Sequence, residues 1–182
     1  MAQSAAASFN PAHRLMDQTI EATLRNADTS PAEAHDDAVQ LYGTLQLPSP
    51  ETIGERFTHQ VSGGQLQRVM TAMAMSPRPD LIIFDEPTTA LDVTTQVEVL
   101  AAIRDIVSRF NTAAIYITHD LAVVAQMADK IKVLRYGQTI EDAPTRQMLT
   151  NPQQPYTKSL WAVRSIQRDQ RASGEIILSM QG

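Results

Sequence analysis

The chain of 182 residues contains no cysteine, which excludes disulfide bonds, thiolate metal sites and iron–sulfur clusters, and which fits a reducing compartment. It also has no excess of positive charge. Fifteen basic and 20 acidic side chains give a net charge of −5, so the composition offers no basic face of the kind that nucleic acids require. No apolar run approaches the roughly 18 residues of a membrane-spanning helix. We therefore expect any link to a membrane to be made through partner proteins.

A phosphate-binding P-loop is also missing from these residues. Such a loop needs a glycine followed by lysine and then by serine or threonine. The chain has seven glycines and none of them is followed by lysine. The sequence as it stands therefore contains no cradle for a triphosphate.

What is present is an ordinary apolar fraction of 43%, enough for one domain with a real core. Residues 1 to about 60 are expected to form helices and loops. Ser30-Pro31-Ala32-Glu33 predicts a helix start, with a serine N-cap, proline at the first helical position and a capping box. The prolines in 47–50 end this helix. Its apolar stripe is Ala34, Ala38, Leu41, Tyr42 and Leu45.

The pattern changes after Gly64, where strands begin to alternate with helices. A helix is expected up to Ser76-Pro77, with its apolar stripe at Leu66, Val69, Met70, Met73 and Ala74. The short apolar run 81–84 is typical of a strand that is buried on both faces of a parallel sheet. The long helix that follows is expected to bury Val97, Leu100, Ala101, Ile103 and Val107.

A second buried strand is expected at 113–117, followed by a helix that Asp120 begins and that runs to Met127. Residues 131–134 and 138–140 suggest a closing strand pair. This alternation predicts an α/β layered domain with a parallel sheet core. Ligands of such sheets bind beyond the carboxyl ends of the strands, which is where Asp85, Glu86 and His119 fall.

Ser62-Gly63-Gly64 is a candidate anion site. Two glycines allow the backbone to approach a ligand closely, and the following helix directs unpaired N–H groups and its positive dipole end outward. A flexible turn capped by serine is the other interpretation, and the motif by itself leaves both open. The methionines are expected to fill the core rather than to form a binding surface.

The adjacent carboxylates Asp85 and Glu86 are candidates for acid–base and metal chemistry. Asp85 is placed to hold Mg²⁺ and Glu86 to polarise an attacking water. The other interpretation is that both carboxylates are solvated charges of a loop. His119 is placed either to contact a terminal phosphate or to be satisfied by backbone. Asp92 is a candidate N-cap of the long helix, which is compatible with a role at a subunit contact.

The order of the motifs, taken together, carries a resemblance to a known family. Gln3 is followed by Val-Ser-Gly-Gly-Gln (61–65), Leu-Ile-Ile-Phe-Asp-Glu (81–86), Ala-Leu-Asp (90–92) and His119. This order closely resembles the ATP-binding domain of ABC transporters, over nearly the whole chain. The segment Asn-Pro-Gln-Gln-Pro-Tyr-Thr (151–157), with Phe-Asn-Pro (9–11), is similar to the oligopeptide, dipeptide and nickel importer group.

The resemblance implies a P-loop NTPase-like fold with an α-helical subdomain, and it implies roles for single residues. Gln3 would sense Mg²⁺ and water at the junction of the lobes, and Asp85 would be the Walker B aspartate that holds Mg²⁺. Glu86 would be the catalytic base and His119 the switch histidine. The signature, Ser62, Gly63, Gly64 and Gln65, would touch the γ-phosphate of ATP held by the opposite subunit, and Asp92 would face that subunit.

The resemblance also divides the chain. Residues 1–60 would hold the glutamine loop and the helical subdomain, residues 61–142 part of the ATPase core, and residues 143–182 a helical extension and linker. Val61 replaces the usual leucine, a tolerable change. The larger departure is that the family's P-loop is not among these residues, so we expect a fragment that is inactive alone and has an exposed apolar surface. Residues 175–182 resemble the opening strand of a second such domain, and a chance similarity is the alternative interpretation.

The function implied by the resemblance is that of an ATP-hydrolysing subunit of an importer for peptides or a similar small solute. Its cofactors would be ATP and Mg²⁺. Its partners would be a second ATPase domain, transmembrane permease subunits and, indirectly, a solute-binding protein, with no nucleic acid. It would lie in the cytoplasm against the inner face of the membrane. The alternatives are an accessory ATPase outside transport, in phosphonate breakdown or in repair, and a degenerate interaction module without catalysis.

Overall fold

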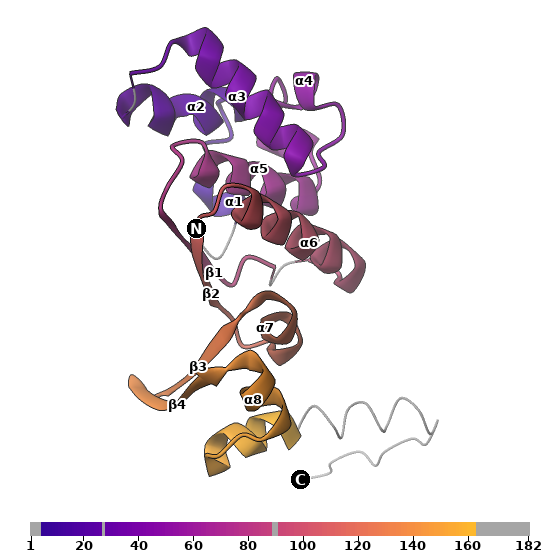
Figure 1. Ribbon diagram of the computed structural model, residues 1–182. Coiled ribbons are helices and arrows are strands. Elements are labelled where there is room, and N and C mark those ends of the chain that lie inside the picture. The colour runs from indigo at the N-terminus through magenta and orange to yellow at the C-terminus, as the bar shows by residue number, and fades with distance from the viewer. Residues whose placement is uncertain (1–4, 27, 89–90, 163–182) are drawn as a thin grey trace, which may run out of the picture. The chain divides into compact units, whose positions relative to one another are not determined.

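The computed structural model describes residues 5–26, 28–88 and 91–162. The chain divides into two compact units, residues 1–119 and 120–182, which we describe separately (Figure 1). The functional boundaries predicted from the sequence, after residues 60 and 142, are not tested by this division into compact units and stay predictions.

The first unit combines helices with one pair of strands. Before the strands lie α1 (Ala5–Ser8), α2 (Leu15–Asn26), α3 (Pro31–Thr44), α4 (Pro50–Ile53), a 3-10 turn η1 (Thr58–Gln60) and α5 (Gly63–Met75). Then come β1 (Leu81–Asp85), α6 (Val93–Arg109) and β2 (Ala113–Ile117).

Helix α3 begins and ends where the sequence predicts. The Ser30 hydroxyl accepts a hydrogen bond from the Glu33 amide, and the Glu33 carboxylate accepts one from the Ser30 amide, which completes the capping box. The predicted apolar stripe of this helix is fully inside, with all five side chains at most 2% exposed. These local signals therefore specified the helix correctly.

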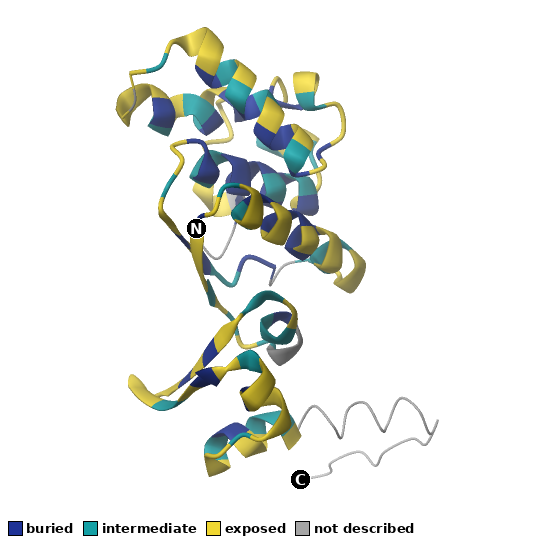
Figure 2. Ribbon diagram, viewed as in Figure 1, coloured by how far each residue is buried: buried dark blue, intermediate teal, exposed yellow. Residues whose placement is uncertain are grey.

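The core of the first unit lies among α2, α3, α5 and α6 (Figure 2). The Tyr42 hydroxyl is buried and lies 2.7 Å from the Thr19 hydroxyl, and burial raises the pKa of Tyr42 to about 12. Interior phenols are usually paired in this way because an unpaired polar group in the core costs free energy. The other large, fully buried side chains of this core include Leu41, Leu45, Ile53, Met70, Met75, Ile103 and Ile106.

The predicted inner faces of α5 and α6 are partly wrong. Met73 and Ala74 on α5 are only half-buried. On α6, Val97 is 53% exposed and Ala101 is also exposed, and Val107 is half-buried. The residues that α6 buries are Val99, Leu100, Ala102, Ile103 and Ile106. The buried stripe of α6 is thus rotated relative to the predicted one, because contact with α5 decides which apolar residues face inward.

Strands β1 and β2 pair in parallel, with Ile83 opposite Ile115 and Asp85 opposite Ile117. The side chains of Ile82 and Phe84 point into the core, at 4% and 1% exposure. The prediction of burial on both faces is wrong, because the side chains on the other face stay about half exposed. This uncovered face consists of Leu81, Ile83, Ile115 and Ile117, which are 44–49% exposed.

The second unit contains α7 (Leu121–Met127), the strands β3 (Lys130–Arg135) and β4 (Gln138–Pro144), and α8 (Thr145–Thr150). The strands form an antiparallel hairpin across Tyr136 and Gly137, as predicted. Gly137 has a φ of +76°, a conformation that suits a tight turn and that glycine adopts without strain. A small core of Ile131, Val133, Ala143 and Met148 holds this unit together.

The carboxylate of Glu141 fastens the segment after α8 to β4. It accepts hydrogen bonds from the backbone amides of Gln153 and Gln154, at 2.7 and 3.0 Å, and these bonds lower its pKa. Residues 155–162 are helical and place Tyr156 and Trp161 against the small core. The segment that resembles the importer group is therefore a packed part of the second unit.

Candidate functional site

The carboxyl ends of β1 and β2 bring the predicted catalytic pair together. The Nδ1 atom of His119 lies 2.8 Å from the Oε1 atom of Glu86. Where the Glu86 carboxylate is ionised it can only accept, and Nδ1 of His119 is then the donor. The Glu86 side chain is 23% exposed and the His119 side chain 74% exposed. The pair is thus accessible from solvent, at the edge where parallel sheets bind ligands.

Glu86 is held in this position by an unusual backbone. Its φ is +46°, in the left-handed region, which costs a non-glycine residue about 1–2 kcal/mol. Its amide donates to the Ile117 carbonyl at 2.9 Å, which continues the pairing of the strands by one residue. A strained conformation of this kind is maintained by its surroundings and is common at active sites.

Asp85 is half-buried at the last position of β1, directly before Glu86. Its oxygen atoms suit Mg²⁺, a hard ion that is commonly held by one or two carboxylates together with water and substrate phosphates. Among the described residues no group of three or more potential ligands gathers around a point.

The predicted anion site begins α5. The Ser62 hydroxyl accepts from the Gln65 amide at 3.3 Å, and the Gln65 side chain accepts from the Ser62 amide at 3.0 Å. These bonds leave the amides of Gly63 and Gly64 without intrahelical acceptors, as at every helix start. Ser62 and Gly63 are exposed. Serine thus caps the helix and the capped end faces solvent, while anion binding at this end stays a prediction.

The two glycines of this helix start have different environments. A Cβ atom on Gly63 would lie 3.5 Å from Leu91, an ordinary contact. A Cβ atom on Gly64 would lie 2.3 Å from the Cγ2 atom of Thr95 on α6, which is impossible without a shift. Gly64 is therefore required for the close approach of α5 to α6, a reason that the sequence did not reveal.

Asp92 is the N-cap of α6, as predicted. Its carboxylate accepts from the amides of Thr94 and Thr95, at 3.1 and 3.0 Å. These bonds lower the pKa of Asp92, and the bond from the Thr95 amide has the largest effect. Asp92 is exposed, so the capping role leaves it accessible to a neighbouring subunit. Gln3, the remaining predicted site residue, lies outside the described residues.

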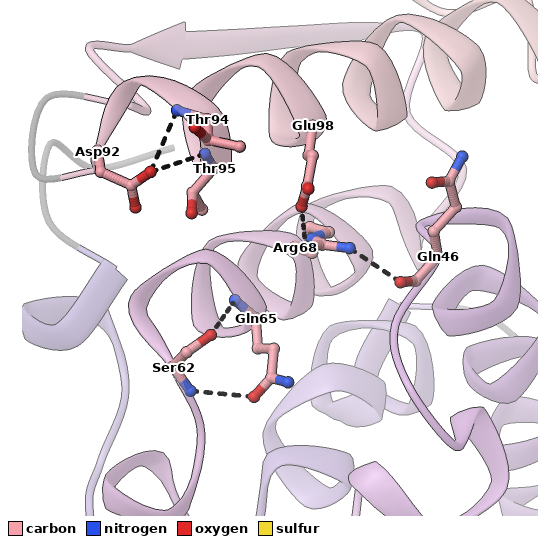
Figure 3. A network of polar contacts seen from close by, with 8 residues as sticks. All are labelled: Gln46, Ser62, Gln65, Arg68, Asp92, Thr94, Thr95 and Glu98. Atoms are coloured by element: carbon pink, nitrogen blue, oxygen red, sulfur yellow. Dashed lines mark hydrogen bonds and ion pairs between the residues drawn. The ribbon is translucent and has the colours of Figure 1, made fainter.

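One polar group near the site was missed by the sequence reasoning. Arg68, six residues after Ser62, donates to the Gln46 carbonyl and to the Glu98 carboxylate, so it joins α5 to two other segments (Figure 3). A dispersed arginine gives no signal in the sequence, because one of its partners is a backbone carbonyl.

Of the described helices, none combines the length and the apolar character that crossing a membrane demands.

Comparison with known proteins shows which family and which fold this chain resembles. Residues 3–89 match the model of the family described as ABC transporter. The structure is similar to the dimeric structure of a post-hydrolysis state of the ATP-binding cassette MJ0796 bound to ADP and Pi. The TM-score is 0.64 and the sequence identity 23%, over 75% of this chain and 59% of the other. The architecture is therefore that of the ATP-binding cassette, a P-loop NTPase-like fold.

Sequence relatives are consistent with this result. The chain is 41% identical over 155 residues to the glutathione import ATP-binding protein GsiA of Escherichia coli (strain K12) and to that of Shigella flexneri. The match covers 85% of this chain and 25% of each relative, so the chain spans about a quarter of their length. These matches confirm the predicted resemblance to the ATP-binding domain of ABC transporters and the predicted fold class.

Proposed function

We propose that this chain is part of an ATP-hydrolysing subunit of an ABC importer for peptides or a similar small solute. The contact between Glu86 and His119 is the observation that carries the proposal. It combines a carboxylate able to accept a proton from water with a second polar group beside it, at the ligand-binding edge of a parallel sheet. The importer class is supported by the relatives, which are named for glutathione import.

In this proposal Glu86 accepts the proton of the attacking water, and the hydrogen bond from His119 holds the Glu86 carboxylate in place. Asp85 would hold Mg²⁺, and the bound ion would neutralise phosphate charge during transfer. Gln3 is proposed to assist there. Positioned general-base help is worth about 10²–10⁴ in rate.

The exposed start of α5 would act on a different nucleotide, one held by a second ATPase domain. Ser62, Gly63, Gly64 and Gln65 would meet its terminal phosphate, because helix amides and the positive end of the dipole favour an anion there. Asp92 would face the same partner. Permease subunits would then dock on the helical segment before residue 60, with the ATPase at the inner face of the membrane.

The chain by itself is proposed not to hydrolyse ATP. No glycine-lysine-serine or glycine-lysine-threonine sequence occurs in its 182 residues. Without such a cradle, the Asp85 and Glu86 carboxylates would bring negative charge toward an anionic ligand with little to offset it. Equilibrium titration of the chain with Mg-ATP should therefore show no saturable binding, and an ATPase assay no turnover.

A grafted protein tests the phosphate role of α5. The segment that precedes the matched region in the Escherichia coli relative is joined to this chain, and Glu86→Gln blocks turnover. We expect Mg-ATP to convert this protein from monomer to dimer in size-exclusion chromatography. Ser62→Asp should abolish the dimer, because aspartate caps a helix as well as serine does but places a negative charge against the phosphate.

Ser62→Asn is the matched control, since asparagine is an equally good cap without the charge. A dimer that forms equally well with Ser62→Asp and with Ser62→Asn would contradict the proposed anion site. An accessory ATPase outside transport would pass the same test, and only binding to permease subunits would distinguish it from an importer.

A further inference from the structure

Arg68 makes two directed contacts from the second turn of α5. Its Nη1 atom donates to the Gln46 carbonyl at 2.8 Å, and its Nη2 atom lies 3.4 Å from the Glu98 Oε2 atom (Figure 3). The Arg68 side chain is only 12% exposed. The guanidinium is therefore engaged inside the first unit and is not displayed to a ligand.

The two partners of Arg68 belong to different segments. Gln46 lies two residues after the end of α3, in a turn where its φ is +55° and its amide donates to the Gly43 carbonyl. This turn presents the Gln46 carbonyl to the arginine. Glu98 lies on α6 and its side chain is 59% exposed. Of the two contacts, the short bond to the carbonyl is the stronger, because exposed ion pairs contribute little.

A second close contact fixes α5 one turn earlier. Gly64 approaches Thr95 so closely that no Cβ atom fits between them. The pair Gly64 and Thr95, and the pair Arg68 and Glu98, are spaced by three or four residues on each helix, so they lie on the facing sides. Two fixed points a turn apart define both the translation and the rotation of α5 against α6.

From these contacts we infer that Arg68 is a positioning residue, which holds the start of α5 against the α3 turn and against α6. The inference rests on the proposed function, in which Ser62 at the start of α5 meets a phosphate and Asp92 at the start of α6 faces the same partner. Arg68 would act through these helices without touching the nucleotide. A displacement of about 1 Å at a phosphate site is enough to impair binding there. A residue that keeps the start of α5 in place would therefore matter for that site.

The alternative is that Arg68 contributes stability alone, as many arginines do. Arg78 offers the matched control, because it forms an ion pair with Asp37 of α3 and lies over the Phe110 ring, 4.0 Å from its centre. It follows the other end of α5, away from Ser62. Loss of Arg78 should weaken packing between the same elements and leave the start of α5 in place.

The experiment measures a distance between two spin labels on the full chain, without ATP. The chain has no cysteine, so labels can be attached at Gly63→Cys on the first turn of α5 and at Gln40→Cys, an exposed position of α3. Pulsed electron paramagnetic resonance then gives the distance distribution. For Arg68→Gln we expect a broader distribution whose mean moves by about 1–2 Å, the size of a helix shift between packed elements.

Two further variants grade the effect. Arg68→Lys should recover part of the mean but keep a broader distribution than the parent, because lysine can still donate to the Gln46 carbonyl but lacks the planar fork that reaches both partners. Glu98→Gln should change the distribution least. If Arg68→Gln does not fold, Arg68→Lys decides, since a mean identical to the parent with unchanged width would overturn the inference.

The inference also fails if Arg68→Gln leaves the distribution unchanged, or if Arg78→Gln moves it equally. Because the measurement contains no nucleotide, its outcome does not depend on whether Ser62 binds phosphate. The ATP-dependent dimer of the grafted protein tests that separate question.

Discussion

The helices of the first unit and its pair of strands use similar apolar side chains with very different results. Ile103 on α6 is fully buried, whereas Ile115 on β2 is 48% exposed. The helices bury their apolar side chains within the described residues, whereas those on one face of the sheet stay about half exposed. Burial is thus decided by what covers a residue and not by its hydropathy, and the pair of Glu86 and His119 lies at the end of the less covered element.

The largest expected effect is a difference in stability loss when an isoleucine is truncated in each of these two regions. Ile103→Ala should lower the free energy of unfolding by about 2–5 kcal/mol, because it removes buried methyl and methylene groups and leaves a cavity. Ile115→Ala should cost no more than about 1 kcal/mol, because about half of the side chain is already in water. Denaturant unfolding of the two variants measures both values, and equal losses would break the comparison.

The next largest effect concerns the contact between α5 and α6. Gly64→Ala should destabilise by about 1–3 kcal/mol through overpacking against Thr95. Gly63→Ala, one residue away, meets only ordinary contacts and is the control. Thr95→Ser removes the Cγ2 atom that obstructs the new methyl group, so Gly64→Ala combined with Thr95→Ser should recover most of the loss in thermal unfolding. No recovery would show that the clash is elsewhere.

Substitutions on the uncovered sheet face should have a smaller effect on stability but a clear effect on self-association. Contiguous apolar surfaces of this kind promote association. Ile83→Thr combined with Ile115→Thr, which are opposite each other in the sheet, should shift the chain toward monomer in sedimentation velocity. Val97→Thr changes an exposed but separate apolar residue on α6 and should not. A parent chain that is already monomeric would contradict the expectation.

The smallest effect is a dependence on pH. The pKa of Asp92 is lowered in the folded chain, so Asp92 contributes stability above its ordinary pKa, and this contribution is lost as the pH falls through the folded value. The difference in melting temperature between the parent and Asp92→Asn should shrink on acidification across that range. A difference that stays constant down to the most acidic condition would show that the charge of Asp92 does not stabilise α6.

The sequence predicted those features that depend on local signals or on the geometry of parallel strands. Ser30 and Ser62 both begin helices because a capping box needs only residues three positions apart. The approach of Glu86 to His119 was predicted because the ends of neighbouring parallel strands lie at the same edge. The proximity of Glu86 and His119 was therefore predicted from the sequence, and the roles of the predicted site residues with a nucleotide are proposals.

Other features could not be read from the sequence because tertiary contacts decide them. The apolar run that contains Ile83 is compatible with burial on one face or on two. The inner face of α6 includes Val99 and not Val97, since its contact with Gly64 sets its rotation. The bond from Arg68 to the Gln46 carbonyl involves a backbone atom, for which no residue type gives a signal.

The measurement that tests the central claim most directly is the Mg-dependent ATPase rate of the grafted protein. Glu86→Gln should lower the rate by about 10²–10⁴, the contribution of a positioned general base. Asp80→Asn changes an exposed carboxylate next to the opposite end of β1 and should leave the rate unchanged. If Glu86→Gln and Asp80→Asn hydrolyse ATP at the same rate, Glu86 is not the catalytic base and the account is contradicted.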